Sequence, residues 1–319
     1  MRRAALAVAL LAVPGCAGAL HRAERSDRWV TRHPATLART EVGAAAVGKW
    51  LLVVGGFRKQ DAATTSAVER YDIETDTWKR VHSMPIALNH AAAASWGGHL
   101  YVVGGYTSAH GLSHESRRLF RYGIPHDRWV ELPPMPTARA ALGATAVQNR
   151  LMYAVGGARG GKPLRRLDVY SFKHRRWRKG PPMPTAREHL AVASAGGYVY
   201  ALGGRVAGKG NLAVAERFDT ARHRWERLPD MAKARSGIAA VRVGQSIVVF
   251  GGEEAGGTIR EVEMYDPSER RWTPLPDMRT PRHGLGGAVL HRRVFAVEGG
   301  PQPGLHFSRA IEALDVPAP

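Results

Sequence analysis

The chain has 319 residues, a formal net charge of +19 and a sequence pI near 10.8. A chain of this length can bury a large core without covalent cross-links. Cys16 is the only cysteine, so an intramolecular disulfide is excluded. The basic charge favours anionic partners, although the arginines are scattered along the chain and also suit a solvated surface.

The first fifteen residues have the layout of a secretory signal peptide. Arg2 and Arg3 precede an apolar stretch over residues 4–13 that is too short to span a bilayer. The Val-Pro-Gly-Cys sequence that ends at Cys16 resembles a bacterial lipobox, which implies lipid modification of this cysteine. The proline is unusual there, so ordinary cleavage near Ala17-Gly18-Ala19 is the alternative.

We therefore expect an exported protein, either periplasmic or on the cell surface, with residues 16–26 as a short tether to a lipid anchor at Cys16. Loss of Arg2 and Arg3 with the signal peptide lowers the formal charge from +19 to +17. Export also separates the protein from cytosolic nucleic acid, so we expect no nucleic-acid partner despite the high pI.

A Gly-Gly doublet recurs along the chain at steps of 49, 52, 47, 48 and 48 residues. The six doublets are Gly55-Gly56, Gly104-Gly105, Gly156-Gly157, Gly203-Gly204, Gly251-Gly252 and Gly299-Gly300. Each follows an apolar run that is typical of a strand covered on both faces. A period near fifty residues predicts one four-stranded unit repeated around a ring.

An aromatic residue and a tryptophan seven positions later follow each of the first five doublets. The pairs are Tyr71 and Trp78, Tyr122 and Trp129, Tyr170 and Trp177, Phe218 and Trp225, and Tyr265 and Trp272. Doublet, aromatic and tryptophan together resemble the kelch repeat over residues 27–319. The resemblance implies an all-β fold, a six-bladed kelch β-propeller in one domain, which we expect to be a monomer.

The sixth repeat is divided between the two ends of the chain. Residues 310–315 match the aromatic segment of the first repeat, with Leu314 in the aromatic position, but no tryptophan follows. The missing tryptophan is Trp29, within an Asp-Arg-Trp-Val sequence that occurs again around Trp129. We predict that the N-terminal strand closes the last blade and removes two free sheet edges.

Five repeats carry an arginine after the tryptophan strand and an acid two residues before the aromatic position. The arginines are Arg39, Arg139, Arg187, Arg235 and Arg282, and the acids are Glu69, Asp168, Glu216, Glu263 and Glu312. The second repeat lacks both and has Leu88 and Phe120 instead. Paired loss predicts contact within one blade, so we interpret the arginines as structural, in enclosed bidentate ion pairs. The alternative is a ring of anion-binding arginines.

In kelch propellers that bind peptides or act as enzymes, the residues just after this arginine and those after each doublet line the channel mouth. The resemblance therefore implies a ligand site at Asn89, His90, Tyr106, Glu188, His189, Arg205, Glu253 and His283. The three histidines and Glu188 are residue types that bind zinc. Because His283 lies one residue earlier in its repeat than the other two, we expect a polar channel lining, with no metal and no cofactor.

Two functions fit this layout. The first is a non-enzymatic module that binds an envelope protein or an acidic or neutral glycan. The second is a carbohydrate epimerase or mutarotase, because Glu254 and Arg260 resemble in spacing the catalytic pair of the N-acetylneuraminate epimerase, a periplasmic kelch protein. A copper radical oxidase is excluded, since its cofactor needs a cysteine that the mature repeats lack.

Overall fold

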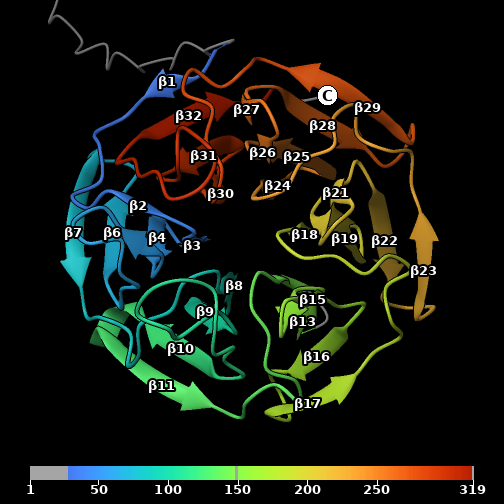
Figure 1. Cartoon of the computed structure of the whole chain (residues 1–319), viewed down its shortest axis with the longest axis horizontal. Helices are drawn as coiled ribbons and strands as arrows, with labels where there is room; N and C mark the ends of the chain where they lie inside the picture. The colour runs from blue at the N-terminus through green and yellow to red at the C-terminus, as the bar shows by residue number, and fades with distance from the viewer. Residues whose placement is uncertain (1–27, 148–149, 318–319) are drawn as a thin grey trace, which may run out of the picture.

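The structure is a computed structural model that describes residues 28–147 and 150–317. Six four-stranded antiparallel sheets stand radially around a central channel (Figure 1). This is a six-bladed β-propeller, as the repeat period predicted. The predicted signal peptide, the tether and Cys16 lie outside the described residues. No helix within 28–147 or 150–317 has the length and apolar character needed to cross a bilayer.

Each blade runs from an inner strand at the channel to an outer strand at the rim. Blade 1 consists of β3 (Gly43–Val47), β4 (Trp50–Val54), β6 (Val68–Asp72) and β7 (Thr77–Val81). Blade 2 consists of β8 (Ala92–Trp96), β9 (His99–Val103), β10 (Leu119–Gly123) and β11 (Arg128–Leu132), with a short 3-10 helix over Ile124–His126. Blade 3 consists of β12 (Gly143–Val147), β13 (Leu151–Val155), β16 (Leu167–Ser171) and β17 (Arg176–Lys179).

The other three blades repeat this plan. Blade 4 consists of β18 (Ala191–Ala195), β19 (Tyr198–Leu202), β22 (Ala215–Asp219) and β23 (Arg224–Arg227). Blade 5 consists of β24 (Ala239–Val243), β25 (Ser246–Phe250), β28 (Val262–Asp266) and β29 (Arg271–Leu275). Blade 6 consists of β30 (Gly286–Leu290), β31 (Arg293–Val297), β32 (Ile311–Asp315) and β1 (Val30–Thr31).

The aromatic–tryptophan pairs join the third strand of a blade to its outer strand and then to the neighbouring blade. Tyr71 and Trp78 are cross-strand partners, and their ring centroids lie 5.0 Å apart. The tryptophan indole then donates a hydrogen bond to a main-chain carbonyl of the adjacent blade, as from Trp177 to Pro133 at 2.7 Å. The same bond recurs at all six tryptophans of the repeat position, with donor–acceptor distances from 2.7 to 3.0 Å.

The N-terminal strand closes the ring as predicted. β1 pairs antiparallel with β32, with Val30 opposite Ala313 (Figure 1). Trp29 is fully buried, packs against Phe250 at 5.8 Å between ring centroids, and donates to the Pro276 carbonyl at 2.8 Å. The described start of the chain therefore lies beside its end in one sheet.

The doublet glycines end the second strand of each blade in the left-handed region. At Gly55, with φ of 64°, a Cβ would lie 2.2 Å from the Leu88 carbonyl oxygen, so a side chain collides with the neighbouring segment. The sixth blade departs from the sequence interpretation. Its structural doublet is Glu298-Gly299, because Gly299 donates to the Arg39 carbonyl as Gly105 donates to the Arg139 carbonyl. Glu298 adopts φ of 55° and is fully buried.

The five arginines of the repeat position are structural, as predicted, and each is fully buried. The ion pairs within one blade are Arg39–Glu69, Arg139–Asp168, Arg187–Glu216, Arg235–Glu263 and Arg282–Glu312, with N–O distances from 2.6 to 3.5 Å. The prediction that these ion pairs are bidentate was wrong. A second guanidinium nitrogen instead donates to a main-chain carbonyl, for example from Arg187 to Ala201 at 2.8 Å.

Candidate functional site

The fold itself joins the two groups of residues that the sequence placed at the channel mouth. In every blade the first residue after the arginine position pairs with the residue after the doublet, as Asn89 pairs with Tyr106 and Glu188 with Arg205. In the first blade the pairing residues belong to the two-stranded sheet of β2 (Arg39–Thr40) and β5 (Phe57–Arg58). Short hairpins extend this face at β14 (Ala158–Arg159) with β15 (Lys162–Pro163), β20 (Arg205–Val206) with β21 (Gly210–Asn211), and β26 (Glu253–Glu254) with β27 (Gly257–Thr258).

The second residue after the arginine position of each repeat lies at the channel, and the six such residues together form a ring around it. The six residues are Glu41, His90, Ala141, His189, Gly237 and Gly284, all left-handed with φ from 51° to 64°. Each of the last five donates a main-chain hydrogen bond of 2.8 to 3.1 Å to the ring residue before it, and Val42 completes the circle by donating to the Gly284 carbonyl at 3.3 Å. This backbone turns the side chains of Glu41, His90, Ala141 and His189 toward the channel, while Gly237 and Gly284 leave space there.

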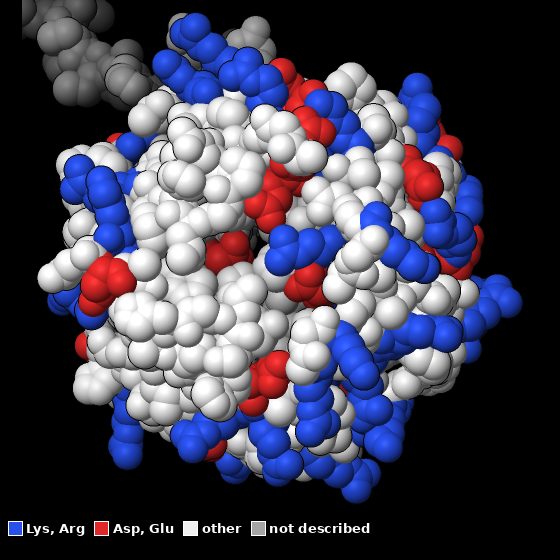
Figure 2. Space-filling view, viewed as in Figure 1, with Lys and Arg blue, Asp and Glu red and all other residues white. Residues whose placement is uncertain are grey.

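A cavity of about 260 Å³ opens above this ring. It is lined by Glu41, Phe57, His90, Gly111, Leu112, His189, Arg205, Glu253, His283, Gly304 and Leu305. Figure 2 shows acidic atoms around the central hollow, while most lysines and arginines lie toward the periphery. Glu188 and Glu253 pair with Arg205, whereas Glu41 pairs with His90. Three carboxylates and one guanidinium leave a formal charge of −2 before the histidines are counted. The channel mouth is therefore acidic although the whole chain is basic.

Arg205 is held between two carboxylates from neighbouring blades. Its Nε donates to Glu188 at 2.6 Å and its Nη1 to Glu253 at 3.0 Å, and Nη2 lies 3.3 Å from Nε2 of His189. Glu188 also contacts Nδ1 of His189. Burial lowers the pKa of Arg205, but Glu188 and Glu253 outweigh it and the net shift is upward. A fully engaged Arg205 orients its neighbours more readily than it captures an anion.

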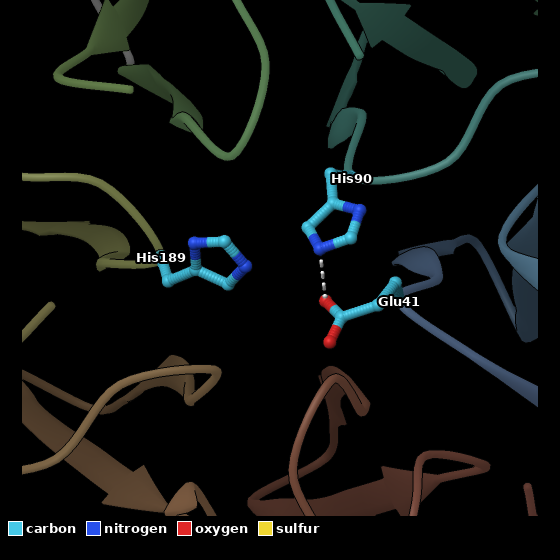
Figure 3. Close-up of side chains that lie close together, drawn as sticks. All are labelled: Glu41, His90 and His189. Atoms are coloured by element: carbon cyan, nitrogen blue, oxygen red, sulfur yellow. Dashed lines mark ion pairs between the residues drawn. The ribbon is translucent and has the colours of Figure 1, made fainter. Parts of the chain in front are cut away.

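Glu41 connects two histidines on opposite sides of it. Its Oε2 lies 3.1 Å from Nε2 of His90, and its Oε1 lies 3.4 Å from Nδ1 of His283. Figure 3 shows the Glu41–His90 contact and a ring nitrogen of His189 directed toward it. Ligand atoms of Glu41, His90 and His189 all lie within 4.8 Å of one another, which makes them a possible metal-binding group.

The surroundings shift the pKa values of these groups in different directions. Burial lowers the pKa of His90 to about 4. Burial also opposes ionisation of Glu41, but the neighbouring histidines hold the pKa of its carboxyl well below the usual range. For His283, burial lowers the pKa while Glu41 and Glu253 raise it, and the net direction is upward. Burial raises the pKa of Tyr106 to about 12, so its hydroxyl stays neutral.

The structure brings together the eight residues that the resemblance implied. His90, His189, Arg205, Glu253 and His283 line the cavity, while Asn89, Tyr106 and Glu188 contact them from behind. His283 converges with the other histidines despite its earlier position in the repeat, because Gly284 leaves space beside Glu41. A Cβ on Gly284 would lie 2.6 Å from Oε1 of Glu41.

Three contributors were not among the eight residues that the resemblance singled out. Glu41 occupies the same repeat position as His90 and His189, and that alignment is the signal that identifies it. Leu112 and Leu305 lie in irregular loops whose lengths differ between repeats, so no periodic signal marks them.

Glu254 and Arg260, the pair of the epimerase alternative, lie outside the cavity. Both are exposed, and Glu254 faces Lys233 at 3.9 Å. In the part of the chain that the structure describes, no hydrogen bond or ion pair joins Glu254 to Arg260. The structure gives this pair no enclosed polar site in which to act on a sugar.

Comparison with known proteins agrees with the architecture. A model described as the KLHDC2/KLHL20/DRC7 Kelch-repeats domain matches residues 41–232, which is more than half of the chain, and a Kelch motif model matches residues 234–279. A search of curated proteins finds no significant match.

Proposed function

This chain belongs to the Kelch-repeat family, and we propose from that premise that it is a binding module whose channel-mouth cavity holds a segment of a partner protein. Kelch propellers generally serve as binding or scaffold modules. Here the variable side chains gather at one face, on a frame of repeated strands and buried ion pairs, which is how a binding site is grafted onto a symmetric fold.

The observation that carries the proposal is the position of the exposed leucines. Large hydrophobic side chains are exposed at only three of the described residues: Val30 at 39%, Leu112 at 51% and Leu305 at 52%. Two of these three border the same cavity, whose floor is polar. Exposed apolar groups at the rim of a concave polar site are typical of a surface that a partner covers.

The same features favour a protein segment over a glycan. The aromatic rings nearest the cavity, Phe57 and Tyr106, are buried at 1% and 4% exposure, so neither presents a free face for a sugar to stack on. A peptide can place apolar side chains against Leu112 and Leu305 and offer main-chain N–H groups to Glu253 and Glu41. The acidic floor further suits a neutral or basic segment better than an acidic one.

The test is co-purification from an envelope extract followed by mass spectrometry, with a glycan array in parallel. We expect one protein partner to be retained, and the double variant Leu112→Arg/Leu305→Arg to lose it while unfolding at the same temperature. Val30→Arg is the matched control, because it changes an exposed apolar residue away from the cavity. Equal retention by the double variant, or binding only on the glycan array, would contradict the proposal.

We propose in addition that the module is exported and held at a bacterial membrane through Cys16. The signal-peptide layout and the lipobox-like sequence of the first sixteen residues support this. In a bacterial host, the full chain should partition with membranes, and Cys16→Ser should release it into the soluble periplasmic fraction. Unchanged partitioning of Cys16→Ser would contradict the lipid anchor without affecting the binding proposal.

A further inference from the structure

The hydrogen bonds around His90 end at a main-chain carbonyl, which can only accept. They therefore fix which ring nitrogen of His90 carries the proton. Thr64 donates its hydroxyl hydrogen to the Ser108 carbonyl at 2.6 Å, so it accepts from Nδ2 of Asn89 at 2.7 Å. The amide oxygen of Asn89 then faces Nδ1 of His90 at 2.6 Å, and Nδ1 must carry the proton. A neutral His90 therefore presents a lone pair on Nε2 toward the carboxylate of Glu41.

The other two histidines show the same pattern. Nε2 of His283 donates to the Gly304 carbonyl at 3.0 Å, so in the neutral ring Nδ1 is the lone pair. His283 is 2% exposed, and this Nδ1 has no hydrogen-bond partner. Nδ1 of His189 contacts the Glu188 carboxylate, which leaves Nε2 as its acceptor. An outer amide, carbonyl or carboxylate that fixes the tautomer in this way is the usual support of a metal-binding histidine.

The lone pairs of His90 and His283 face the Glu41 carboxylate, an arrangement that a bound cation stabilises, whereas Nε2 of His189 faces Nη2 of Arg205. From this geometry we infer that the channel mouth binds one divalent transition-metal ion of the zinc class through Glu41, His90 and His189, with His283 at the edge of the site. Two imidazoles and one carboxylate are a ligand set that zinc takes in proteins, with a fourth position left for water or another group. The ion would also reduce the formal negative charge of the site.

The separations suit such an ion after a small movement. With zinc–ligand bonds of about 2.0–2.2 Å, tetrahedral ligand atoms lie roughly 3.4 Å apart. The Glu41–His90 separation of 3.1 Å is near this value, whereas the group as a whole spans up to 4.8 Å. His189 must therefore move inward, and Arg205 must release its contact with Nε2 of His189. Arg205 keeps its two carboxylate partners when it does so.

The experiment uses the full chain, stripped with a chelator, dialysed and titrated with Zn²⁺ or Co²⁺ alone. We expect one equivalent to bind, with the visible absorption bands of four- or five-coordinate Co²⁺, and the unfolding temperature to rise with metal. Glu41→Gln and His90→Gln should each weaken binding at least tenfold. His174→Gln is the matched control, since His174 is an exposed histidine on blade 3.

Two results would overturn the inference. One is that the unaltered chain shows no Co²⁺ bands at one equivalent. This result does not depend on whether any variant folds. The other is that Glu41→Gln and His90→Gln bind as tightly as His174→Gln, which would place any bound metal elsewhere. Either result would assign the contacts of Glu41 to protonated histidines. Because partner capture is scored separately with Leu112→Arg/Leu305→Arg, this failure and that of the proposed function remain distinguishable.

Discussion

The buried ion pair of blade 4 allows a sharp test of how the frame is held together, because blade 2 supplies a natural apolar version. Arg187 donates to Glu216 at 2.6 Å and to the main-chain carbonyl of Ala201 at 2.8 Å, and both side chains are buried. In blade 2 the same two positions hold Leu88 and Phe120, both fully buried. We therefore compare Arg187→Leu with the double variant Arg187→Leu/Glu216→Phe.

The single change strands a buried carboxylate. Glu216 then keeps only Thr185 as a side-chain partner, and breaking a buried pair in this way costs about 3–5 kcal/mol. For a chain of this size, that corresponds to a fall in Tm on the order of 10 °C. The double change removes both charges together, so the remaining cost is the lost donor to Ala201, about 1–3 kcal/mol, offset by apolar packing.

Thermal and urea unfolding at pH 7, followed by circular dichroism, measure the three proteins side by side. We expect the double variant to recover at least half of the stability that Arg187→Leu loses. A double variant less stable than the single one would refute the reasoning, since both lack the arginine and its carbonyl contacts, and the result would show that the unpaired Glu216 carboxylate is not the main cost. A loss below 1 kcal/mol in the single variant would equally refute it.

Three further predictions concern closure, pH and the ring. Trp29→Ala should destabilise the fold by about 3–5 kcal/mol, because it empties a fully buried site beside the closing strand, whereas Val30→Ala should cost little. Equal Tm values for these two variants would contradict closure of the ring by this strand. Burial raises the pKa of Glu298 from its ordinary value of 4.5 to about 8, so the folded protein keeps a proton that the unfolded chain has lost between these values. Stability should therefore fall as pH rises from about 5 to 8 and stay flatter in Glu298→Gln, as unfolding midpoints across that range would show. Gly284→Ala should displace the Glu41 carboxylate and weaken Zn²⁺ binding in the titration above, with a left-handed backbone cost of about 1 kcal/mol; unchanged affinity would place the metal away from Glu41.

The repeat pattern was sufficient to predict the number of blades, the four strands of each blade and the closure of the ring by the N-terminal strand. Apolar runs, doublets and aromatic–tryptophan pairs each report a local requirement that recurs in every blade, such as the close approach at Gly55 or the cross-strand contact of Tyr71 with Trp78. The Arg–acid pairs could also be predicted, since the second repeat lacks both members and has Leu88 and Phe120 in their place. The sixth doublet was misplaced by one residue, because Glu298 adopts the left-handed backbone that glycine has in the other blades. Sequence alone does not show that Arg39 donates to its carboxyl group.

The order of residues by itself determined a propeller of six similar sheets, because each repeat restates the same local geometry. Only the tertiary structure decided what the channel mouth is chemically. Glu41, His90, His189 and His283 come from four different blades, and their contacts depend on how far each side chain extends across the channel. The direction of each imidazole proton also depends on neighbours distant in the chain, such as Ser108 and Gly304, whose positions no spacing in the sequence reveals.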